Sequence, residues 1–268
     1  MISSAFHRDN RAVNRAGADG PAERQRRPSP TGVGFLSEWF NHPVHGPLPA
    51  LLLLLTVATG VVDAVSILAL GRVFIANMTG NVVFIGFALA GAPGFSLLAS
   101  LLALVGFLVG AAVCAPAISR WRTARGRLLA VVSTAELVLL AAALAIAWAS
   151  IEPLRGTPQN LIVVVAATAL GMQNAAAREL AVPDATTTVL TMTLTGFAAD
   201  LRQRNGRVLL RRLFAVTAML VGGGAGAALV LRHGAIWALA LSLVLVALVC
   251  LGAWVLGTRP GPWQNPAR

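Results

Sequence analysis

The chain has 268 residues, of which 57% are hydrophobic and only 12% are charged, and its mean hydropathy is +0.76. Soluble domains carry roughly 25% charged residues, and a chain of this size has no room for a separate soluble domain beside long apolar runs. The net charge of +11 comes from 21 basic residues, all of them arginine, and most lie in the tails or between apolar runs. This pattern indicates an integral membrane protein and disfavours nucleic-acid binding.

The first 46 residues are rich in Arg, Pro, Gly and Ser and show little apolar periodicity. This composition predicts a disordered, Arg-rich cytoplasmic tail at 1–46. No short apolar segment with a small-residue cleavage site follows closely, so we do not expect a cleaved signal peptide. Residues 47–257 are predicted to form a single transmembrane domain, and residues 258–268 a short cytoplasmic tail.

Six apolar runs follow, each of about 20 residues, the length that an α-helix needs to cross roughly 30 Å of hydrocarbon. The runs lie at approximately 48–70, 95–117, 128–149, 161–180, 213–231 and 235–256. The sequence therefore predicts an all-α membrane protein with about six transmembrane helices.

Two shorter apolar stretches, 73–90 and 185–199, are each interrupted by small and polar residues. The interruptions are Asn77-Met78-Thr79-Gly80-Asn81 and Thr191-Met192-Thr193-Leu194-Thr195-Gly196. Gly and Asn are poor helix formers and Thr is β-branched, so both stretches are predicted to be broken or re-entrant helices. The alternative stays open, because a stretch such as 73–90 is long enough to cross.

The distribution of arginine favours the re-entrant interpretation. If both short stretches dip in and return, 18 arginines are cytoplasmic, and the other three, Arg72, Arg155 and Arg232, lie outside. If both stretches crossed instead, the split would fall to 14 against 7. The positive-inside rule therefore favours six spans with both termini in the cytoplasm.

An internal repeat is indicated by motifs that recur at a constant spacing. The pair Thr-Gly recurs after 116 residues, as does a Gly-x-x-x-Gly-Ala-Ala motif that begins at Gly106 and again at Gly222. Gly60-Val-Val-Asp63-Ala resembles Gly171-Met-Gln-Asn174-Ala at a spacing of 111. Each half, about 48–150 and 158–256, contains three spans, so the second would enter the membrane from the opposite side. This predicts an inverted 3+3 repeat, a layout of many secondary transporters.

Two carboxyl groups fall within the predicted spans. Asp63 lies within about 6 Å of the midplane of the first span, where a charge costs on the order of 2.5–3.5 kcal/mol on insertion scales. Asp63 is a candidate proton, cation or substrate site, and a structural hydrogen bond to a neighbouring helix is the alternative. Glu136 lies in mid-helix and could stay neutral, because burial disfavours the ionised form. That property suits proton coupling, and a structural bond to a backbone carbonyl is again the alternative.

The other candidate binding residues are uncharged. Gln173 and Asn174 are the second-half counterparts of the region around Asp63, and amides also bond across helices for structural reasons. A broken helix leaves backbone N–H and C=O groups that attract ions, although a purely structural kink is the alternative. The polar side chains that the two interruptions add are those of Asn77, Thr79, Asn81, Thr191, Thr193 and Thr195.

Small residues and sulfur are interpreted as packing features. Gly106, Gly110, Gly222 and Gly226 are expected to allow close helix–helix packing, either between the halves or at a homo-oligomer face. The two cysteines fall within apolar runs and no His/Cys cluster occurs, so we expect neither a metal site nor a cofactor.

Four blocks of this sequence resemble those of the YoaK-like bacterial membrane proteins. They are Val62-Asp63-Ala64-Val65-Ser66, the block 71–81 that contains Ala76-Asn77-Met78-Thr79-Gly80-Asn81, Gly171-Met172-Gln173-Asn174-Ala175, and the block 186–196. The resemblance covers about residues 45–256. It implies a bacterial inner (cytoplasmic) membrane location but no activity, since the family is a domain of unknown function. The long Arg-rich tail departs from the short tail expected, and a regulatory role for 1–46 stays open.

These features predict a secondary transporter of a small solute, with proton coupling as an option and the lipid bilayer as its surroundings. Asp63 and Glu136 would be the coupling carboxylates, and the two Thr-Gly interruptions the substrate cradle. The alternatives are a passive channel and a non-transporting scaffold or partner subunit. No Walker-type motif, Ser–His pair or HExxH motif occurs, so we expect neither ATP-driven pumping nor an enzyme.

Overall fold

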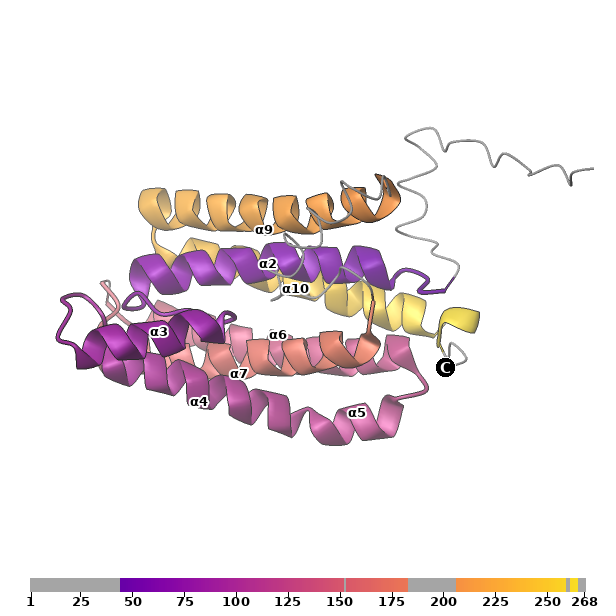
Figure 1. Ribbon diagram of the computed structural model, residues 1–268, viewed down its shortest axis with the longest axis horizontal. Coiled ribbons are helices and arrows are strands. Elements are labelled where there is room, and N and C mark those ends of the chain that lie inside the picture. The colour runs from indigo at the N-terminus through magenta and orange to yellow at the C-terminus, as the bar shows by residue number, and fades with distance from the viewer. Residues whose placement is uncertain (1–43, 152, 183–205, 259–260, 265–268) are drawn as a thin grey trace, which may run out of the picture. The chain divides into compact units, whose positions relative to one another are not determined.

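The computed structural model describes residues 44–151, 153–182, 206–258 and 261–264 (Figure 1). Within these residues every regular element is helical. The elements are α2 (Leu48–Ala69), α3 (Met78–Leu89), α4 (Leu97–Val113), α5 (Ala115–Trp121), α6 (Arg125–Ala149), α7 (Thr157–Leu180), α9 (Gly206–His233), α10 (Ala235–Gly257) and a final 3-10 turn (Pro262–Gln264).

Six stretches of helix in the described residues are long and apolar enough to cross a membrane, which confirms the predicted number. They are Leu48–Ala69, Leu97–Trp121, Arg125–Ala149, Thr157–Leu180, Leu209–His233 and Ala235–Gly257, each 22 to 25 residues long. The second comprises α4 and α5, which meet at Cys114. Pro116 in the first turn of α5 has no N–H to continue the α4 ladder, which accounts for the break.

The boundaries of the helices follow local sequence signals. The side chain of Ser96 accepts a hydrogen bond from the Ala99 N–H at 3.2 Å and so caps the start of α4. Gly156 (φ +67°) and Gly234 (φ +95°) stand just before α7 and α10, in left-handed backbone that suits glycine. The helices therefore begin and end close to the limits of the apolar runs.

The six spanning helices pack in a regular pattern. α4 packs along α7 and α9 packs along α2, while α6 and α10 pack on each other. α6 also packs on α7, and α10 on α2. α2 and α7 are the most buried helices, and successive spans run in opposite directions (Figure 1). α2 and α7 therefore supply much of the interior of the bundle.

The glycines predicted to serve helix packing lie at two close crossings. At Gly106 an added Cβ would stand 2.9 Å from the Val164 carbonyl oxygen, and at Gly110 it would overlap that of Thr168, both on α7. On α9, a Cβ at Gly222 would overlap the carbonyl oxygen of Val57 on α2. Close approach of the two backbones requires glycine at these positions. Gly226 meets α2 one turn further on.

The arginines of the described residues gather at one end of the bundle. Arg120, Arg122, Arg125, Arg127, Arg178, Arg207, Arg211 and Arg212 lie at the end where α5 meets α6. At the opposite end, where α2 ends and α7 and α10 begin, the described arginines are Arg72, Arg155 and Arg232. The two ends are called the Arg-rich end and the Arg-poor end below.

Arg125 ties several elements together at the Arg-rich end. The residue is 6% exposed, and its guanidinium donates to the Leu180 carbonyl at the end of α7 and lies 3.2 Å from His45 Nδ1. The Gln264 side chain links the start of α6 to the end of α10. Its Oε1 accepts from the Gly126 N–H at 3.0 Å, and its Nε2 donates to the Gly257 carbonyl at 2.8 Å. These bonds join α6, α7 and α10 where the helices end.

Candidate functional site

The chain between α2 and α3 turns back along α2 instead of continuing away from it. Gly71 (φ +85°) and Arg72 (φ +56°) reverse the chain. The N–H groups of Ile75 and Ala76 then donate to Oδ1 of Asp63, each at 3.2 Å. Asp63 lies six residues before the end of α2 at Ala69, so the returning backbone reaches about 9 Å back along the helix. Segment 71–77 is therefore re-entrant.

Asn81, in the first turn of α3, fixes the other side of this segment. Its Nδ2 donates to the Phe74 carbonyl at 2.6 Å, and its Oδ1 accepts from the Phe74 N–H at 2.8 Å. Asn81 is fully buried. Its amide thereby satisfies both backbone polar groups of Phe74, as buried polar groups at membrane depth require.

α3 carries the chain back to the Arg-poor end. It has 12 residues, or about 18 Å, against the roughly 30 Å that a span must cover. Its Phe84 ring stacks on Phe74 with centroids 5.5 Å apart and packs on Phe95 at 4.9 Å. The first interrupted stretch is thus a short helix preceded by irregular chain, and residues 78–81 of the predicted interruption form the first turn of α3 instead of a break. The second, 185–199, lies outside the described residues.

Asp63 is the centre of this arrangement. The residue is 7% exposed, and its Oδ1 accepts the two successive N–H groups, a pairing that suits a carboxylate. Its second oxygen receives no hydrogen bond from the part of the chain that the structure describes. Asp63 can therefore hold the re-entrant backbone with one oxygen and bind a proton or ligand with the other.

A hydrogen bond between α2 and α7 lies one turn from Asp63. Gln173 Nε2 donates to Thr59 Oγ1 at 3.0 Å, and Thr59 Oγ1 donates to the Leu55 carbonyl at 2.9 Å. Thr59 and Asp63 are four residues apart and share a face of α2. Gln173 is 2% exposed, and its Oε1 is buried without a partner among the described residues. The two predicted sites on α2 and α7 are thus brought close together.

Glu136 lies in a different setting, on the inward face of α6. It is 1% exposed, and neither carboxyl oxygen has a hydrogen-bond partner within the described residues. Ser133, one turn earlier on the same face, also has a buried hydroxyl without a described partner. A bare carboxylate is expensive in such a place, so a bound proton or cation would stabilise it.

The remaining candidates are dispersed. Asn77 and Thr79 are exposed at the start of α3, and Asn174 is half-buried on α7. Thr191, Thr193 and Thr195 lie outside the described residues. Only Asn81 of the first interruption points into the protein, because residues two apart on a helix do not share a face.

Sequence reasoning missed two residues of the site, Thr59 and Ser133. Each was detectable as a polar residue in an apolar run, one turn before a carboxyl residue on the same face. It also assigned no role to Ile75 and Ala76, which act through their backbone N–H groups. Backbone donors leave no residue-type signal in a sequence.

The described residues contain no group of three His, Cys, Asp or Glu side chains that could hold a metal ion. Cys114 and Cys250 are both buried and unpaired with each other, and Cys250 Sγ lies 3.3 Å from Thr134 Oγ1. Both cysteines are buried among the helices, as small apolar residues often are.

Six membrane-spanning helices with buried polar residues between them define a polytopic α-helical membrane protein. Residues 51–252 match the family described as "Protein of unknown function (DUF1275)", and the chain belongs to that family. It is 31% identical, over 159 residues, to the UPF0700 transmembrane protein YoaK of Bacillus subtilis (strain 168). That match covers 58% of this chain and 67% of the relative. The predicted resemblance is confirmed, and no solved structure matches the chain significantly.

Proposed function

We propose that this protein is a secondary transporter of a small solute, with Asp63 and the re-entrant segment 71–77 at its binding site. The observation that carries the proposal is the Asp63 carboxyl group, whose Oδ1 is held by two backbone N–H groups and whose second oxygen has no hydrogen-bond partner in the described part of the chain. Irregular backbone at membrane depth is found where protein buries it or where it lines a wet cavity, and intramembrane carboxyl groups mark ion and substrate pathways.

An inverted repeat is part of this proposal, and the packing of the helices supports it. If α2, α4 and α6 correspond to α7, α9 and α10, the pairing of α2 with α9 corresponds to that of α7 with α4. The pairing of α10 with α2 corresponds in the same way to that of α6 with α7. Transporters of this type bind substrate where the two halves meet, which is where Thr59 and Gln173 are joined.

The protein is proposed to lie in the bacterial inner membrane with both termini in the cytoplasm. The gathering of described arginines at one end supports this orientation, because cytoplasmic loops carry the excess of positive charge. A cysteine placed at the exposed residue Thr123, at the Arg-rich end, is expected to be shielded from an impermeant thiol reagent in intact cells. Labelling at Thr123 in intact cells would show that the Arg-rich end faces outward, which contradicts the proposed orientation.

Proton coupling is proposed to involve Glu136 together with Asp63. Glu136 has two buried oxygens without described partners, so the carboxyl group is most stable with a proton bound. Release of that proton during transport requires water or a cation to reach α6. The interior face of α6 would thus alternate between a dry and a wet state.

Uptake into proteoliposomes tests the function. A broad screen of radiolabelled solutes, with and without a pH gradient, is expected to identify a solute whose uptake saturates and follows the gradient. Asp63→Asn is expected to slow this uptake at least about tenfold, since it removes the charge but keeps an oxygen acceptor for the backbone. Glu136→Gln is expected to retain uptake down a solute gradient but lose the response to pH.

The outcomes separate the proposed transporter from the alternatives. Flux that neither saturates nor responds to pH would indicate a passive channel instead. Folded wild-type protein that moves no solute in the screen would contradict transport and favour a scaffold or partner subunit. The proposal includes no catalytic role, and a hydrolytic activity abolished by Asp63→Asn would overturn that part of it.

A further inference from the structure

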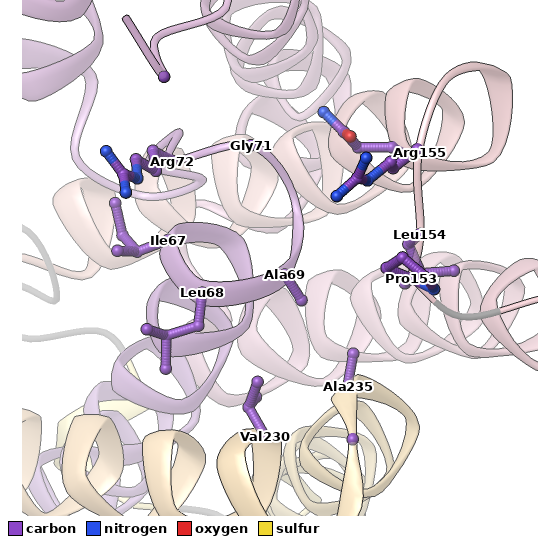
Figure 2. A pocket seen from close by; sticks show the side chains of 13 residues that line it. Ile67, Leu68, Ala69, Gly71, Arg72, Pro153, Leu154, Arg155, Val230 and Ala235 are labelled. Carbon is purple, nitrogen blue, oxygen red and sulfur yellow. The ribbon is translucent and has the colours of Figure 1, made fainter.

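A cavity of about 420 Å³ opens at the Arg-poor end, where α2 ends and α10 begins (Figure 2). Its walls come from the end of α2, the loop after it, the loop before α7 and the junction of α9 with α10. Ile67, Leu68, Leu154, Val230 and Ala235 supply apolar surface. The volume is within the range of about 300–1,000 Å³ that small-molecule sites occupy.

Two guanidinium groups and one amide supply the polar surface of this cavity. Figure 2 shows Arg72 and Arg155 at two edges of the cavity, each from a different loop. Gln159, from the first turn of α7, also lines it. Neither arginine makes a hydrogen bond or ion pair within the described residues, and no described lining residue is acidic. The cavity therefore presents positive charge that the described protein does not neutralise.

Two glycines leave room for the polar side chains of the cavity. A Cβ at Gly71 would stand 2.5 Å from Gln159 Nε2, and a Cβ at Gly94 would stand 2.9 Å from an Arg72 guanidinium nitrogen. Arg72 itself has φ +56°, a left-handed conformation that is strained for a non-glycine residue. A glycine would be more stable at position 72, so arginine there is explained by its side chain, since strained residues collect at functional sites.

We infer that this cavity binds a small organic anion, whose carboxylate or phosphate group is attracted by the positive charge of Arg72 and Arg155 at the two edges and whose short apolar body lies against Ile67, Leu154 and Val230. Guanidinium groups match the planar, two-oxygen geometry of these anions. The Gln159 side chain adds an N–H donor beside Gly71. A cation or a long uncharged solute would leave both guanidinium groups without a partner.

The inference deepens the proposed function by naming the chemical class of the solute, although the binding itself does not require transport. Arg72 directly precedes the re-entrant chain that leads from the Arg-poor end to Asp63. An anion held by Arg72 would therefore lie at the start of that chain. Binding is measured on purified protein and transport is measured in proteoliposomes. A failure of anion binding can therefore be distinguished from a failure of transport.

Calorimetric titration of the purified full-length protein with hexanoate tests the inference, with hexanamide as the uncharged analogue. Hexanoate is expected to bind and hexanamide to bind at least about tenfold more weakly, because a hydrogen bond to a charged group is stronger than one to a neutral amide. Arg72→Gly is expected to weaken hexanoate binding at least about tenfold while keeping or raising the melting temperature, since glycine relieves the backbone strain. Arg155→Ala is expected to weaken binding similarly.

Arg232→Ala is the matched control, because Arg232 is exposed at the same end but does not line the cavity. It is expected to leave hexanoate affinity within about twofold of wild type. An equal loss in Arg232→Ala would show general attraction by positive charge and overturn the site. Equal binding of hexanoate and hexanamide, or unchanged binding in Arg72→Gly, would also overturn it.

The anion can come from solution or from a lipid headgroup, and nanodiscs distinguish the two sources. In phosphatidylcholine nanodiscs, hexanoate is expected to bind as it does in detergent. The natural occupant is the lipid if added phosphatidylglycerol abolishes hexanoate binding and if Arg72→Gly abolishes the association of phosphatidylglycerol with the protein. If neither hexanoate nor phosphatidylglycerol binds in an Arg72-dependent way, the inference is wrong.

Discussion

Replacement of Asp63 by alanine is expected to destabilise the protein by about 2–5 kcal/mol, because two buried backbone donors each lose an acceptor. The donors are the N–H groups of Ile75 and Ala76, and both bonds end on the same carboxyl oxygen. Ile75 and Ala76 are both buried, so their N–H groups have no ready replacement for the lost acceptor. Denaturant titration in detergent micelles, followed by the fluorescence of the six tryptophans, measures the loss.

Asp63→Asn is the matched control for this prediction. Asparagine keeps an oxygen at the position of Oδ1, so its stability is expected to lie within about 1 kcal/mol of wild type. Hydrogen exchange at 71–77 should rise in the alanine variant and stay low in the asparagine variant. If alanine proves as stable as asparagine, the re-entrant backbone does not depend on Asp63.

Gly222→Ala is expected to destabilise the protein by about 1–3 kcal/mol, because its methyl group has no room against α2. The added Cβ would overlap the carbonyl oxygen of Val57, which is backbone and cannot rotate away. Gly224→Ala, two residues along the same helix, meets nothing within 4 Å. It is expected to be neutral or to stabilise by about 0.5–1 kcal/mol through helix propensity.

The difference between these two α9 variants measures the helix crossing itself, since both make the same chemical change. Melting temperatures in one detergent suffice for the comparison. Equal stability of Gly222→Ala and Gly224→Ala would show that α2 and α9 do not approach as closely as the structure has them.

The sequence predicted the spans well because lipid demands continuous apolar runs of fixed length. The fifth run, expected at 213–231, extends to Leu209–His233 as a spanning helix, and the fourth begins at Thr157 instead of 161. These extra turns are polar or carry arginine at the ends, where hydropathy gives no signal. Positions of helix ends depend on capping and contacts that the apolar pattern does not encode.

The candidate site was predicted by residue type but not by geometry. Asp63 and Glu136 stood out because ionisable residues in a span are rare. The sequence could not show that Asp63 contacts the backbone of 75–76, or that Glu136 has no described partner. Both facts depend on how separate elements meet, and the spacing of residues along one helix carries no information on that.

The anion cavity was not predicted at all, and its composition explains why. Its polar residues, Arg72, Arg155 and Gln159, come from two separate regions, and arginine near the end of a span is ordinary in a membrane protein. Left-handed backbone at Arg72 is a second feature that residue type conceals. A glycine at position 71 predicts a turn, but it does not predict that Arg72 also has a positive φ.

Side-specific labelling of Pro93 tests most directly whether residues 71–96 enter and leave the membrane at the same end. Cysteine is placed at Pro93, or at Val44 before α2, both exposed, in a variant with Cys114→Ala and Cys250→Ala. In intact cells an impermeant maleimide is expected to label Pro93→Cys, and to label Val44→Cys only after permeabilisation. Labelling of both positions from the same side would mean that residues 71–96 cross the membrane, and it would contradict the re-entrant arrangement.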